Sequence, residues 1–434
     1  MPQVRVGIMN EPQIAFVLNG NYTVNEDLVS GEQLVACNNG KIIWNGREYT
    51  DLNFMPTEPD QDSFTLRNVT IGVSFHWRRE EDQTFRGALH LIVEDEKITA
   101  INILPIEDYL LSVISSEMSA TASLELLKAH AVISRSWLLA QIRKTPDEVN
   151  SDTEIEQFSD GEYIKWWDRD DHVNFDVCAD DHCQRYQGIT RATTEAVAKA
   201  IKATWGQVLM SNGELCDARF SKSCGGVFEE FENCWESHHH SYLEARRDGE
   251  DETDFPDLTR EAAAEEWILS SPKAFCNTSD KEILSQVLND YDQETTDFYR
   301  WKVEYTQNEI ADLIRRRTGV DYGRIKDLQP VARGTSGRLY KMKIVGEKQC
   351  RVIGKELAIR YALSESALYS SAFVVEKHDV DSAGYPEKFI LYGAGWGHGV
   401  GLCQIGAAVM GAKGYDYREI LLHYFVGASI DKEY

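Results

Sequence analysis

Residues 105–118 read PIEDYLLSVISSEM, and the chain changes character at this stretch. Ile106, Leu110 and Val113 recur at helical spacing, and Glu117 takes the next position on the same stripe. Strand-like runs precede Pro105, whereas the sequence that follows it has a helical pattern. The stretch therefore marks the passage from a β-rich part to a helical part and predicts an α+β fold.

On both sides of this stretch the pattern is regular enough to predict elements. Residues 3–103 contain short strand-like runs broken by Gly, Asn and Asp. Ser119–Ser123 offers helix N-caps for a second long helix over residues 124–143. A short helix near residues 193–202 then precedes a hairpin turn at Asn212-Gly213.

The second half of the chain has a mixed pattern. Residues 258–320 are predicted to be mostly helical, and residues 325–376 to form strands with one short helix near 355–362. A Gly-rich loop follows at residues 393–407. The predicted organisation has four parts: a β-rich part at 1–104, a helical core at 105–243 with an acidic insertion at 147–183, a mostly helical insertion at 244–324, and a mixed C-terminal part at 325–434.

The charge of the chain is strongly negative and unevenly distributed. Its 45 Lys and Arg face 71 Asp and Glu, which gives a formal net charge of −26. Asp147–Asp181 holds thirteen acidic and two basic residues, and Asp248–Asp257 holds six acidic residues and no basic one. We expect both stretches to be solvated, insertion-like segments. The surplus excludes a general nucleic-acid binder and argues against docking on anionic lipid, because both partners attract an excess of Lys and Arg.

Glu117 stands out because it occupies the apolar stripe of its helix, close to the C-terminal end. A carboxylate in that position is buried, paired or functional, since Glu is rarely buried alone. Burial and the helix dipole both favour the protonated form, which a general acid needs at neutral pH. The alternative is an exposed Glu at a frayed helix end, or one that pairs with Arg135 of the next helix.

Four blocks of sequence occur in order along nearly the whole chain. They are Phe85-Arg86-Gly87 with LPIEDY at 104–109; the segment Tyr109–Ser136 with Glu117-Met118 and Arg135; Ser221-x2-Cys224-Gly225-Gly226 with Glu232-Asn233-x-Trp235; and GHGVGLCQIGA at 397–407 with Ile420-Leu421-x-His423-Tyr424. Together they resemble the SpoIID/LytB family, which comprises stage II sporulation protein D and the amidase enhancer.

The resemblance implies a lytic transglycosylase of peptidoglycan. Such an enzyme cleaves the bond between N-acetylmuramic acid and N-acetylglucosamine, on glycan strands already stripped of their stem peptides. In this chain the family's catalytic acid corresponds to Glu117, and residues 105–243 form the catalytic core. One carboxyl group suffices because the sugar's own 6-hydroxyl attacks the anomeric carbon and a 1,6-anhydro end forms.

Seven further residues are predicted to bind the substrate around this acid. They come from the helix after Glu117, the central block and the Gly-rich cleft loop 393–407: Arg135, Ser221, Ser223, Gly225, Gly226, His398 and Gln404. We expect Arg135 to lie near Glu117, where it either orients the acid or satisfies a buried carboxylate.

The acidic insertion contains a group of soft ligands in the pattern His172-x5-Cys178-x3-His182-Cys183. Two thiolates and two imidazoles make a common closed zinc site, so we predict a structural zinc ion that takes no part in the chemistry. Some members of the resembled family carry zinc at a similar cluster. The alternatives are a Cys178–Cys183 disulfide in an oxidising envelope, or two free thiols.

Other functions remain as alternatives. The main one is a non-catalytic glycan-binding module that stimulates a cell-wall amidase. A zinc hydrolase would need three ligands and a water, whereas the cluster offers four ligands. Weaker alternatives are a nucleophilic role for Cys224 and metal binding by His238-His239-His240.

The sequence also bears on where the protein acts. No run approaches 18 apolar residues, so no transmembrane segment is predicted, and the N-terminal residues lack the architecture of a signal peptide. A cytoplasmic protein would fit these observations. Action on peptidoglycan instead implies the cell envelope and an export signal that is not part of this sequence.

Overall fold

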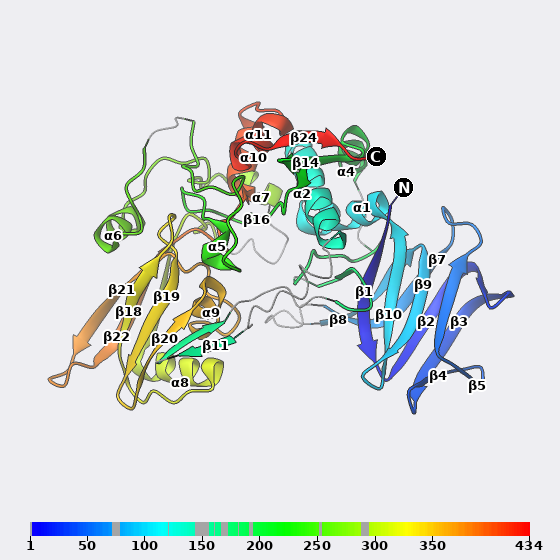
Figure 1. Cartoon of the computed structure of the whole chain (residues 1–434), viewed down its shortest axis with the longest axis horizontal. Coiled ribbons are helices and arrows are strands. Elements are labelled where there is room, and N and C mark those ends of the chain that lie inside the picture. Colours follow the sequence, from blue (N-terminus) through cyan, green and yellow to red (C-terminus); the bar gives the residue numbers. More distant parts are fainter. Residues whose placement is uncertain are drawn as a thin grey trace.

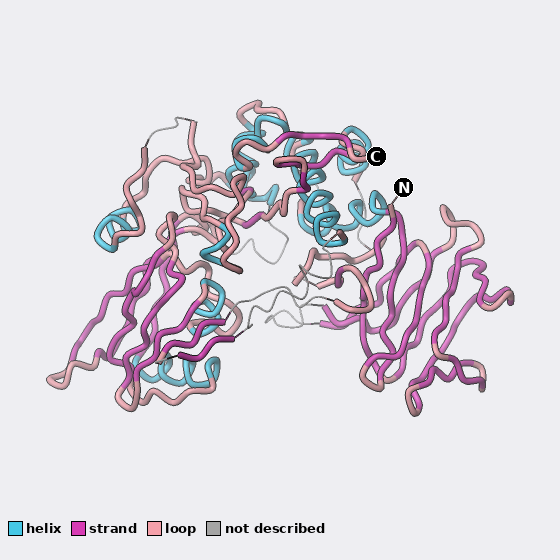
Figure 2. Tube along the Cα trace, viewed as in Figure 1, coloured by secondary structure: helices cyan, strands magenta, loops and turns pink. Residues whose placement is uncertain are grey.

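The computed structural model describes residues 2–71, 79–119, 121–143, 156–159, 161–165, 172–180, 182–190, 194–250, 254–287 and 295–434. Figures 1 and 2 show strands gathered at two ends of the molecule, with a helical layer between them. The predicted α+β class, with a β-rich N-terminal part, is confirmed. In the part of the chain that is described, no helix is long and apolar enough to cross a membrane.

The N-terminal part is one large, mostly antiparallel sheet. Its strands follow the order β13-β1-β10-β9-β6-β2-β3-β4-β5, with β7 paired to β2 and β8 paired to β7. Ile14, Phe16 and Leu18 of β2 are buried at every second position, as a half-buried strand requires. The strands are β1 (Gln3–Glu11), β2 (Gln13–Val24), β3 (Asp27–Asn38), β4 (Lys41–Trp44), β5 (Arg47–Tyr49), β6 (Asp51–Pro56), β7 (Ser63–Ile71), β8 (Arg79–Arg86), β9 (Ala88–Glu94), β10 (Lys97–Pro105) and β13 (Val177–Cys178).

The helical layer begins directly where β10 ends. Both long helices form as predicted, and the Ser123 hydroxyl caps the second by accepting a hydrogen bond from the Leu126 N–H. Helices from the C-terminal end of the chain pack against them, so one hydrophobic core joins the sheet to both ends of the sequence. The helices of this layer are α1 (Ile106–Glu117), α2 (Leu124–Ile142), α4 (Glu195–Ala203), α10 (Gln404–Ala412) and α11 (Tyr417–Tyr424).

A small sheet closes this layer near the chain's C-terminus (Figure 1). The predicted hairpin joins β14 (Gln207–Ser211) to β15 (Glu214–Leu215). Asn212 and Gly213 take positive φ of 53° and 84° in its turn, which suits a tight two-residue hairpin. β24 (Ser429–Lys432) pairs with β14 and so ties the end of the chain to the helical core.

The C-terminal part has its own core, built on two further sheets. One has the order β11-β12-β20-β19-β18 and the other β17-β22-β21. Their elements are β11 (Glu156–Ser159), β12 (Glu162–Lys165), β17 (Arg300–Thr306), β18 (Ile325–Arg333), β19 (Leu339–Gly346), β20 (Cys350–Gly354), β21 (Phe373–Val380), β22 (Pro386–Ala394), α8 (Gln307–Thr318) and α9 (Glu356–Ala362).

The segment predicted to be mostly helical is only partly so. It contains α6 (Glu261–Leu269), α7 (Lys281–Val287) and α8, but β17 lies between the last two. β17 becomes a strand because it pairs along its whole length with β22, from Arg300 opposite Ala394 to Thr306 opposite Lys388. That partner is distant in sequence, so the local pattern did not reveal it.

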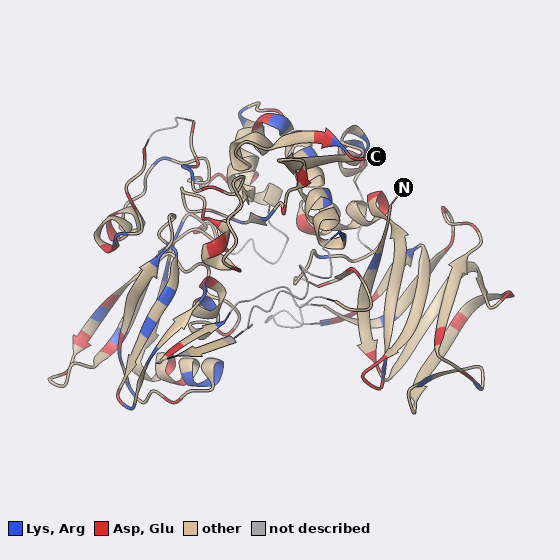
Figure 3. Ribbon diagram, viewed as in Figure 1, with Lys and Arg blue, Asp and Glu red and all other residues tan. Residues whose placement is uncertain are grey.

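The acidic stretches are not simply solvated, which corrects our expectation. Two strands of the first stretch extend the C-terminal sheet: β12 pairs in parallel with β20, and β11 pairs antiparallel with β12. Glu162 on β12 forms a 2.9 Å ion pair with Lys341, in a sheet whose ribbon carries several Lys or Arg positions, blue in Figure 3. In the second stretch Asp248 is fully buried. Residues 144–155, 160, 166–171, 181 and 251–253 of these regions lie outside the described part of the chain.

Candidate functional site

Glu117 is the last residue of α1. Its carboxyl group is half-buried, and its Oε1 accepts a hydrogen bond from the backbone N–H of Arg185 at 3.4 Å. Our expectation of a helix-end carboxylate is confirmed, whereas the expected burial is only partial. The helix stops at this residue, so no further turn covers the side chain.

Residues 184–187 run along α1 and provide the backbone amide that contacts the acid. Tyr109 of the helix donates from its hydroxyl to Gln184 Oε1 at 3.3 Å. The Gln187 N–H donates to Ser112 Oγ at 3.1 Å. Because these bonds lie on both sides of the contacting amide, they fix its position against the end of the helix.

The four predicted metal ligands come together just before this segment. One donor atom from each of His172, Cys178, His182 and Cys183 lies within 4.8 Å of the others. Cys183 Sγ is 3.5 Å from His172 Nε2 and 3.5 Å from His182 Nδ1, and Cys178 Sγ is 3.8 Å from His182 Nδ1. Zinc bonds of about 2.3 Å to sulfur and about 2.0–2.1 Å to nitrogen place such atoms about 3.6 Å apart in a tetrahedron. The residues present therefore fit a zinc ion.

The cluster is built onto the edge of the N-terminal sheet. β13 pairs in parallel with β1, with Cys178 opposite Gly7. The ring of Phe175 lies over Gly7, where a Cβ would come within 2.5 Å of it. The Arg5 N–H donates to Asp176 Oδ2 at 2.8 Å. The same loop thus connects the sheet edge, the four ligands and the segment that contacts Glu117.

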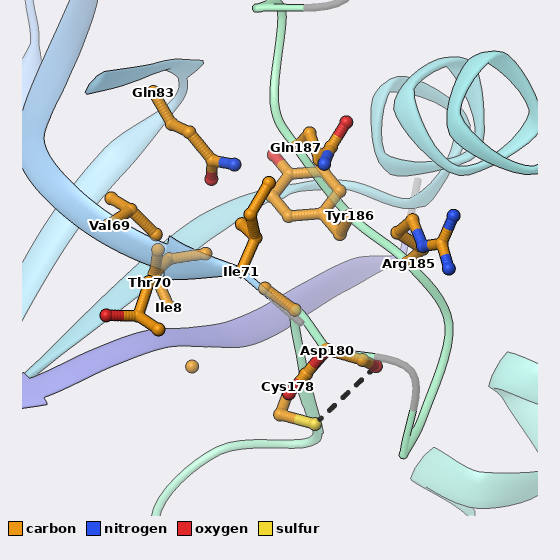
Figure 4. Close-up of a pocket in the computed structure, with 12 residues that line it drawn as sticks. Ile8, Val69, Thr70, Ile71, Gln83, Cys178, Asp180, Arg185, Tyr186 and Gln187 are labelled. Atoms are coloured by element: carbon orange, nitrogen blue, oxygen red, sulfur yellow. Dashed lines mark hydrogen bonds between the residues drawn. The ribbon is translucent and has the colours of Figure 1, made fainter. Parts of the chain in front are cut away.

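A cavity lies between this loop and the sheet (Figure 4). Cys178 and Asp180 lie on one side of it, and Gln83 and Gln187 on another. Arg185 also lines it and contacts Glu117 through its backbone, so the cavity and the acid share this residue. The remaining lining residues are Gly7, Ile8, Val69, Thr70, Ile71, Ala179 and Tyr186.

The central block and the Gly-rich loop pack against each other, although they are far apart in sequence. β16 (Phe220–Ser221) pairs in parallel with β23 (Leu402–Cys403). Ser223 and Trp396 exchange both backbone hydrogen bonds, at 3.0 and 2.7 Å. Gly225 approaches the backbone of Gly395 so closely that a Cβ would lie 2.9 Å from its nitrogen. The two blocks therefore form one compact unit.

This packing buries most of the residues predicted to bind substrate. Ser223 and Gln404 are at most 2% exposed, and Ser221 is 6% exposed. Within the described part of the chain, the Ser221 and Ser223 hydroxyls have no hydrogen-bond partner. Gly225 and Gly226 are buried as well. In this conformation Ser221 and Ser223 are covered where β16 pairs with β23, and Gln404 is buried beside His130 of α2. Substrate binding by these residues stays a prediction.

The prediction for Arg135 also needs correction. Its guanidinium is fully buried and forms a bidentate ion pair with Glu107, at 2.9 and 2.8 Å. It also donates to the Gln207 carbonyl at 2.9 Å. Arg135 therefore satisfies a buried carboxylate, which was one of the two expected roles, but that carboxylate belongs to Glu107 and not to the surroundings of Glu117.

His398 is the member of the predicted set that stays half-buried. Its Nδ1 accepts a hydrogen bond from the Val400 N–H at 3.1 Å, and its ring lies edge-on to Trp235 at 4.7 Å. Burial, together with nearby arginine charges, holds the pKa of His398 well below its usual range. The imidazole is therefore neutral at pH 7.

Helix α7 lies between the end of α1 and the central block. The Ser119 N–H donates to the Gln286 carbonyl at 3.1 Å, and the Ser123 N–H donates to Gln286 Oε1 at 3.0 Å. On its other side Lys222 Nζ donates to the Val287 carbonyl at 2.5 Å. The two predicted regions are thus linked through this helix; residues 288–294, which follow it, lie outside the described part.

The sequence analysis missed a buried arginine that holds the two blocks together. Arg338 is 1% exposed and donates to the carbonyls of Ser223, Cys224 and Gly397 at 3.0 to 3.3 Å. A Cβ on Gly399 would lie 2.4 Å from its guanidinium carbon. No local pattern marks an arginine as buried, so only its glycine-rich surroundings could have suggested this role.

Two family descriptions match parts of the chain. Residues 94–210 match the description "Stage II sporulation protein". Residues 229–401 match a domain of unknown function, DUF8618. The first match contains Glu117, residues 184–187 and the Cys/His cluster, whereas the second contains Arg338 and most of the C-terminal sheets.

Three curated proteins are similar over most of this chain. An uncharacterized protein of Brachyspira hyodysenteriae is 23% identical over 374 residues, which cover 85% of this chain and 74% of that protein. The amidase enhancer of Bacillus subtilis is 25% identical over 333 residues, covering 73% of this chain but only 39% of that protein. Stage II sporulation protein D of the same organism is 21% identical over 341 residues, covering 77% and 76%. These matches confirm the resemblance drawn from the sequence.

Proposed function

Because the chain carries a SpoIID domain, we propose that it is a peptidoglycan lytic transglycosylase with Glu117 as its single acid and base. The observation that carries this proposal is the half-exposed carboxyl group at the end of α1, held by the Arg185 amide. A general acid must be accessible to the substrate, and its carboxyl group must be held in one orientation. The partial exposure of Glu117 gives the access, and the hydrogen bond from the Arg185 amide holds the orientation.

The reaction needs no second carboxylate. The Glu117 carboxyl donates its proton to the glycosidic oxygen as the bond from that oxygen to C1 of the muramic acid breaks. The 6-hydroxyl oxygen of the same sugar then bonds to C1, and its proton passes to the Glu117 carboxylate. The acid is thereby restored, no water is consumed, and the product is a 1,6-anhydro sugar.

We assign a supporting role to the cluster of His172, Cys178, His182 and Cys183. It would hold one zinc ion, and four protein ligands leave no open position for a water or a substrate. The ion would fix the loop that ends in residues 184–187 and hence the amide against Glu117. Zinc would act here as a structural crosslink.

Substrate contacts would come from the cavity beside this loop and from the half-buried His398. Contacts by Ser221, Ser223 or Gln404 would require the Gly-rich loop to move away, since these residues are buried. The substrate would be glycan strands stripped of stem peptides, and the protein would act in the cell envelope, where peptidoglycan lies.

The similarity to an amidase enhancer supports a second candidate function. In that case the chain would bind glycan and stimulate a cell-wall amidase without cleaving the strand itself. The position of Glu117 favours cleavage, because a binding module has no need for a carboxyl group held at the end of a helix.

Digestion of denuded glycan strands by the purified protein separates these functions. We expect soluble 1,6-anhydro products from the unchanged chain and a 10²- to 10⁴-fold slower release from Glu117→Gln, as is typical for loss of a general acid. Glu214→Gln, at an exposed position on β15, is the matched control and should keep full activity. Full activity of Glu117→Gln would refute the mechanism. Co-sedimentation with glycan without cleavage, together with faster turnover of an added amidase, would establish the second function instead.

A further inference from the structure

A second group of metal-type donors lies deep in the molecule, apart from the Cys/His cluster. It consists of Cys224, Asp248, Cys276 and Cys403, all of them buried, with one donor atom each within 4.8 Å of the others. Relative to Cys224, the other three lie 24, 52 and 179 residues away in the sequence.

We propose that these four residues bind one zinc ion in a closed, tetrahedral site. The proposal does not depend on the glycan chemistry assigned to Glu117. It concerns how the central block, the segment after residue 244 and the start of α10 are held together.

The spacing of the donors matches such an ion. The Sγ atoms of Cys224 and Cys276 are 3.6 Å apart, and Cys224 Sγ is 3.5 Å from Asp248 Oδ2. Zinc bonds of about 2.3 Å to sulfur and about 2.0–2.2 Å to oxygen place two sulfurs about 3.8 Å apart, and a sulfur and an oxygen about 3.6 Å apart. The group is too compact to surround a cluster of several iron atoms.

Backbone amides point at the sulfur atoms. Cys403 Sγ accepts hydrogen bonds from the N–H groups of Cys224 at 3.3 Å and Gly406 at 3.4 Å. Cys224 Sγ accepts one from the Gly226 N–H at 3.4 Å. Amide hydrogen bonds to sulfur stabilise thiolate charge and are the outer contacts that tune metal–thiolate sites.

The orientation of Asp248 is fixed from the side opposite the sulfurs. Its Oδ1 accepts a hydrogen bond from the Tyr424 hydroxyl at 2.9 Å and lies 3.6 Å from His423 Nε2. Gly406 makes room for this carboxylate, because a Cβ there would lie 2.9 Å from Oδ1. The other oxygen, Oδ2, accepts a hydrogen bond from the Cys276 N–H at 3.0 Å and faces Cys224 Sγ. A metal ion bound at Oδ2 would add a positive partner to this fully buried carboxylate.

Other uses of these cysteines fit less well. Cys224 is only 2% exposed, so it is not an accessible nucleophile. A Cys224–Cys276 disulfide would need a sulfur separation of about 2.05 Å, whereas the two Sγ atoms are 3.6 Å apart. It would also leave the buried Cys403 and Asp248 without a shared ligand. Coordination of one zinc ion would use all four residues as ligands.

Zinc analysis of the purified full chain tests the proposal. Cys276→Ser and Cys403→Ser should each lower the bound zinc by one equivalent per chain relative to the unchanged protein. Cys234→Ser is the matched control, because this cysteine is also buried but lies outside both clusters, and its zinc content should not change. An unchanged zinc content in a folded Cys276→Ser protein, or a Cys224–Cys276 disulfide found by mass spectrometry in the unchanged protein, would overturn the proposal.

A spectroscopic measurement decides the matter if the serine variants fail to fold. The double variant His172→Ala, Cys183→Ser removes the other cluster and leaves the buried one intact. After exchange with Co²⁺, this protein should bind one equivalent and show strong sulfur-to-cobalt charge-transfer absorption from a tetrahedral, thiolate-rich site. Absence of that absorption refutes the buried site, whatever the protein does to glycan.

Discussion

The two cysteine clusters offer similar chemistry but are assembled in opposite ways. The donors His172, Cys178, His182 and Cys183 lie within twelve consecutive residues and remain partly exposed. The donors Cys224, Asp248, Cys276 and Cys403 are buried and come from segments up to 179 residues apart. The first cluster needs only its own loop to bring its ligands together, whereas the second exists only once the molecule has folded.

This difference indicates what each cluster does for the molecule. Closing a short loop costs little chain entropy, so the local cluster can order one loop with a modest gain in overall stability. The buried cluster joins distant segments, so we expect its loss to affect the global fold. We therefore expect the local cluster to serve the proposed site at Glu117 and the buried one to stabilise the whole chain.

The largest effect is expected beside the buried cluster, where Arg338 donates to the Cys224 carbonyl. Arg338→Met leaves three carbonyls without their donor, two of them buried and one partly buried, at a cost of about 1–3 kcal/mol for each. Allowing for partial relaxation, we expect the free energy of unfolding to fall by about 3–5 kcal/mol, measured by urea denaturation. The exposed Arg315→Met serves as control and should change it by less than about 0.5 kcal/mol. Equal effects of the two variants would contradict the structural role of Arg338.

A smaller effect is expected when the local cluster loses a ligand. Cys183→Ser loosens the loop that positions the Arg185 amide against Glu117, so we expect release of anhydro product to slow by about 10- to 100-fold, the usual cost of a lost supporting contact. The urea midpoint should fall less than in Cys276→Ser. A large loss of stability with unchanged activity would reverse the assignment of the two clusters.

The smallest effect concerns the pH dependence of stability and involves His130. Its Nε2 lies 3.2 Å from Nε2 of Gln404, the residue that follows Cys403 of the buried cluster. Burial, reinforced by the charge of Lys222, lowers the pKa of His130 to about 3. The unfolded chain binds a proton at this residue below about pH 6.5, whereas the folded chain does so only near pH 3, so stability falls as the pH drops between these values.

At pH 5.5 this difference in proton binding lowers the free energy of unfolding by about 1.4 kcal/mol. His130→Gln should show a correspondingly shallower fall of unfolding free energy between pH 7 and 5.5. Protonation of metal ligands is common to both proteins and cancels in the comparison. Identical pH slopes for the two proteins would show that His130 does not titrate as its burial implies.

Sequence reasoning succeeded where the signal was local. The spacing of Ile106, Leu110 and Val113 predicted α1 and placed Glu117 at its end. The twelve-residue pattern around Cys178 predicted four donors that do converge. Periodicity and short spacings survive folding because the backbone geometry of one element or loop fixes them.

Reasoning from sequence failed where a distant partner decided the outcome. Arg135 pairs with Glu107 and not with Glu117. Strands β11 and β12 of the acidic stretch belong to a sheet whose other strands lie beyond residue 324. Ser223 is buried next to the pair of β16 and β23, and Gln404 is buried beside His130 of α2. Burial and ion pairing depend on which distant segments pack together, and a local sequence pattern does not predict that packing.

By itself, the sequence determined the α+β class, the helix that carries Glu117 and the local Cys/His cluster. Only the tertiary structure decided that Arg185 contacts the acid, that Arg338 joins the central block to the Gly-rich loop, and that Cys224, Asp248, Cys276 and Cys403 meet. The physical reason is that spacing along one element is set by backbone geometry, whereas the meeting of distant segments is set by how the whole chain buries its apolar surface.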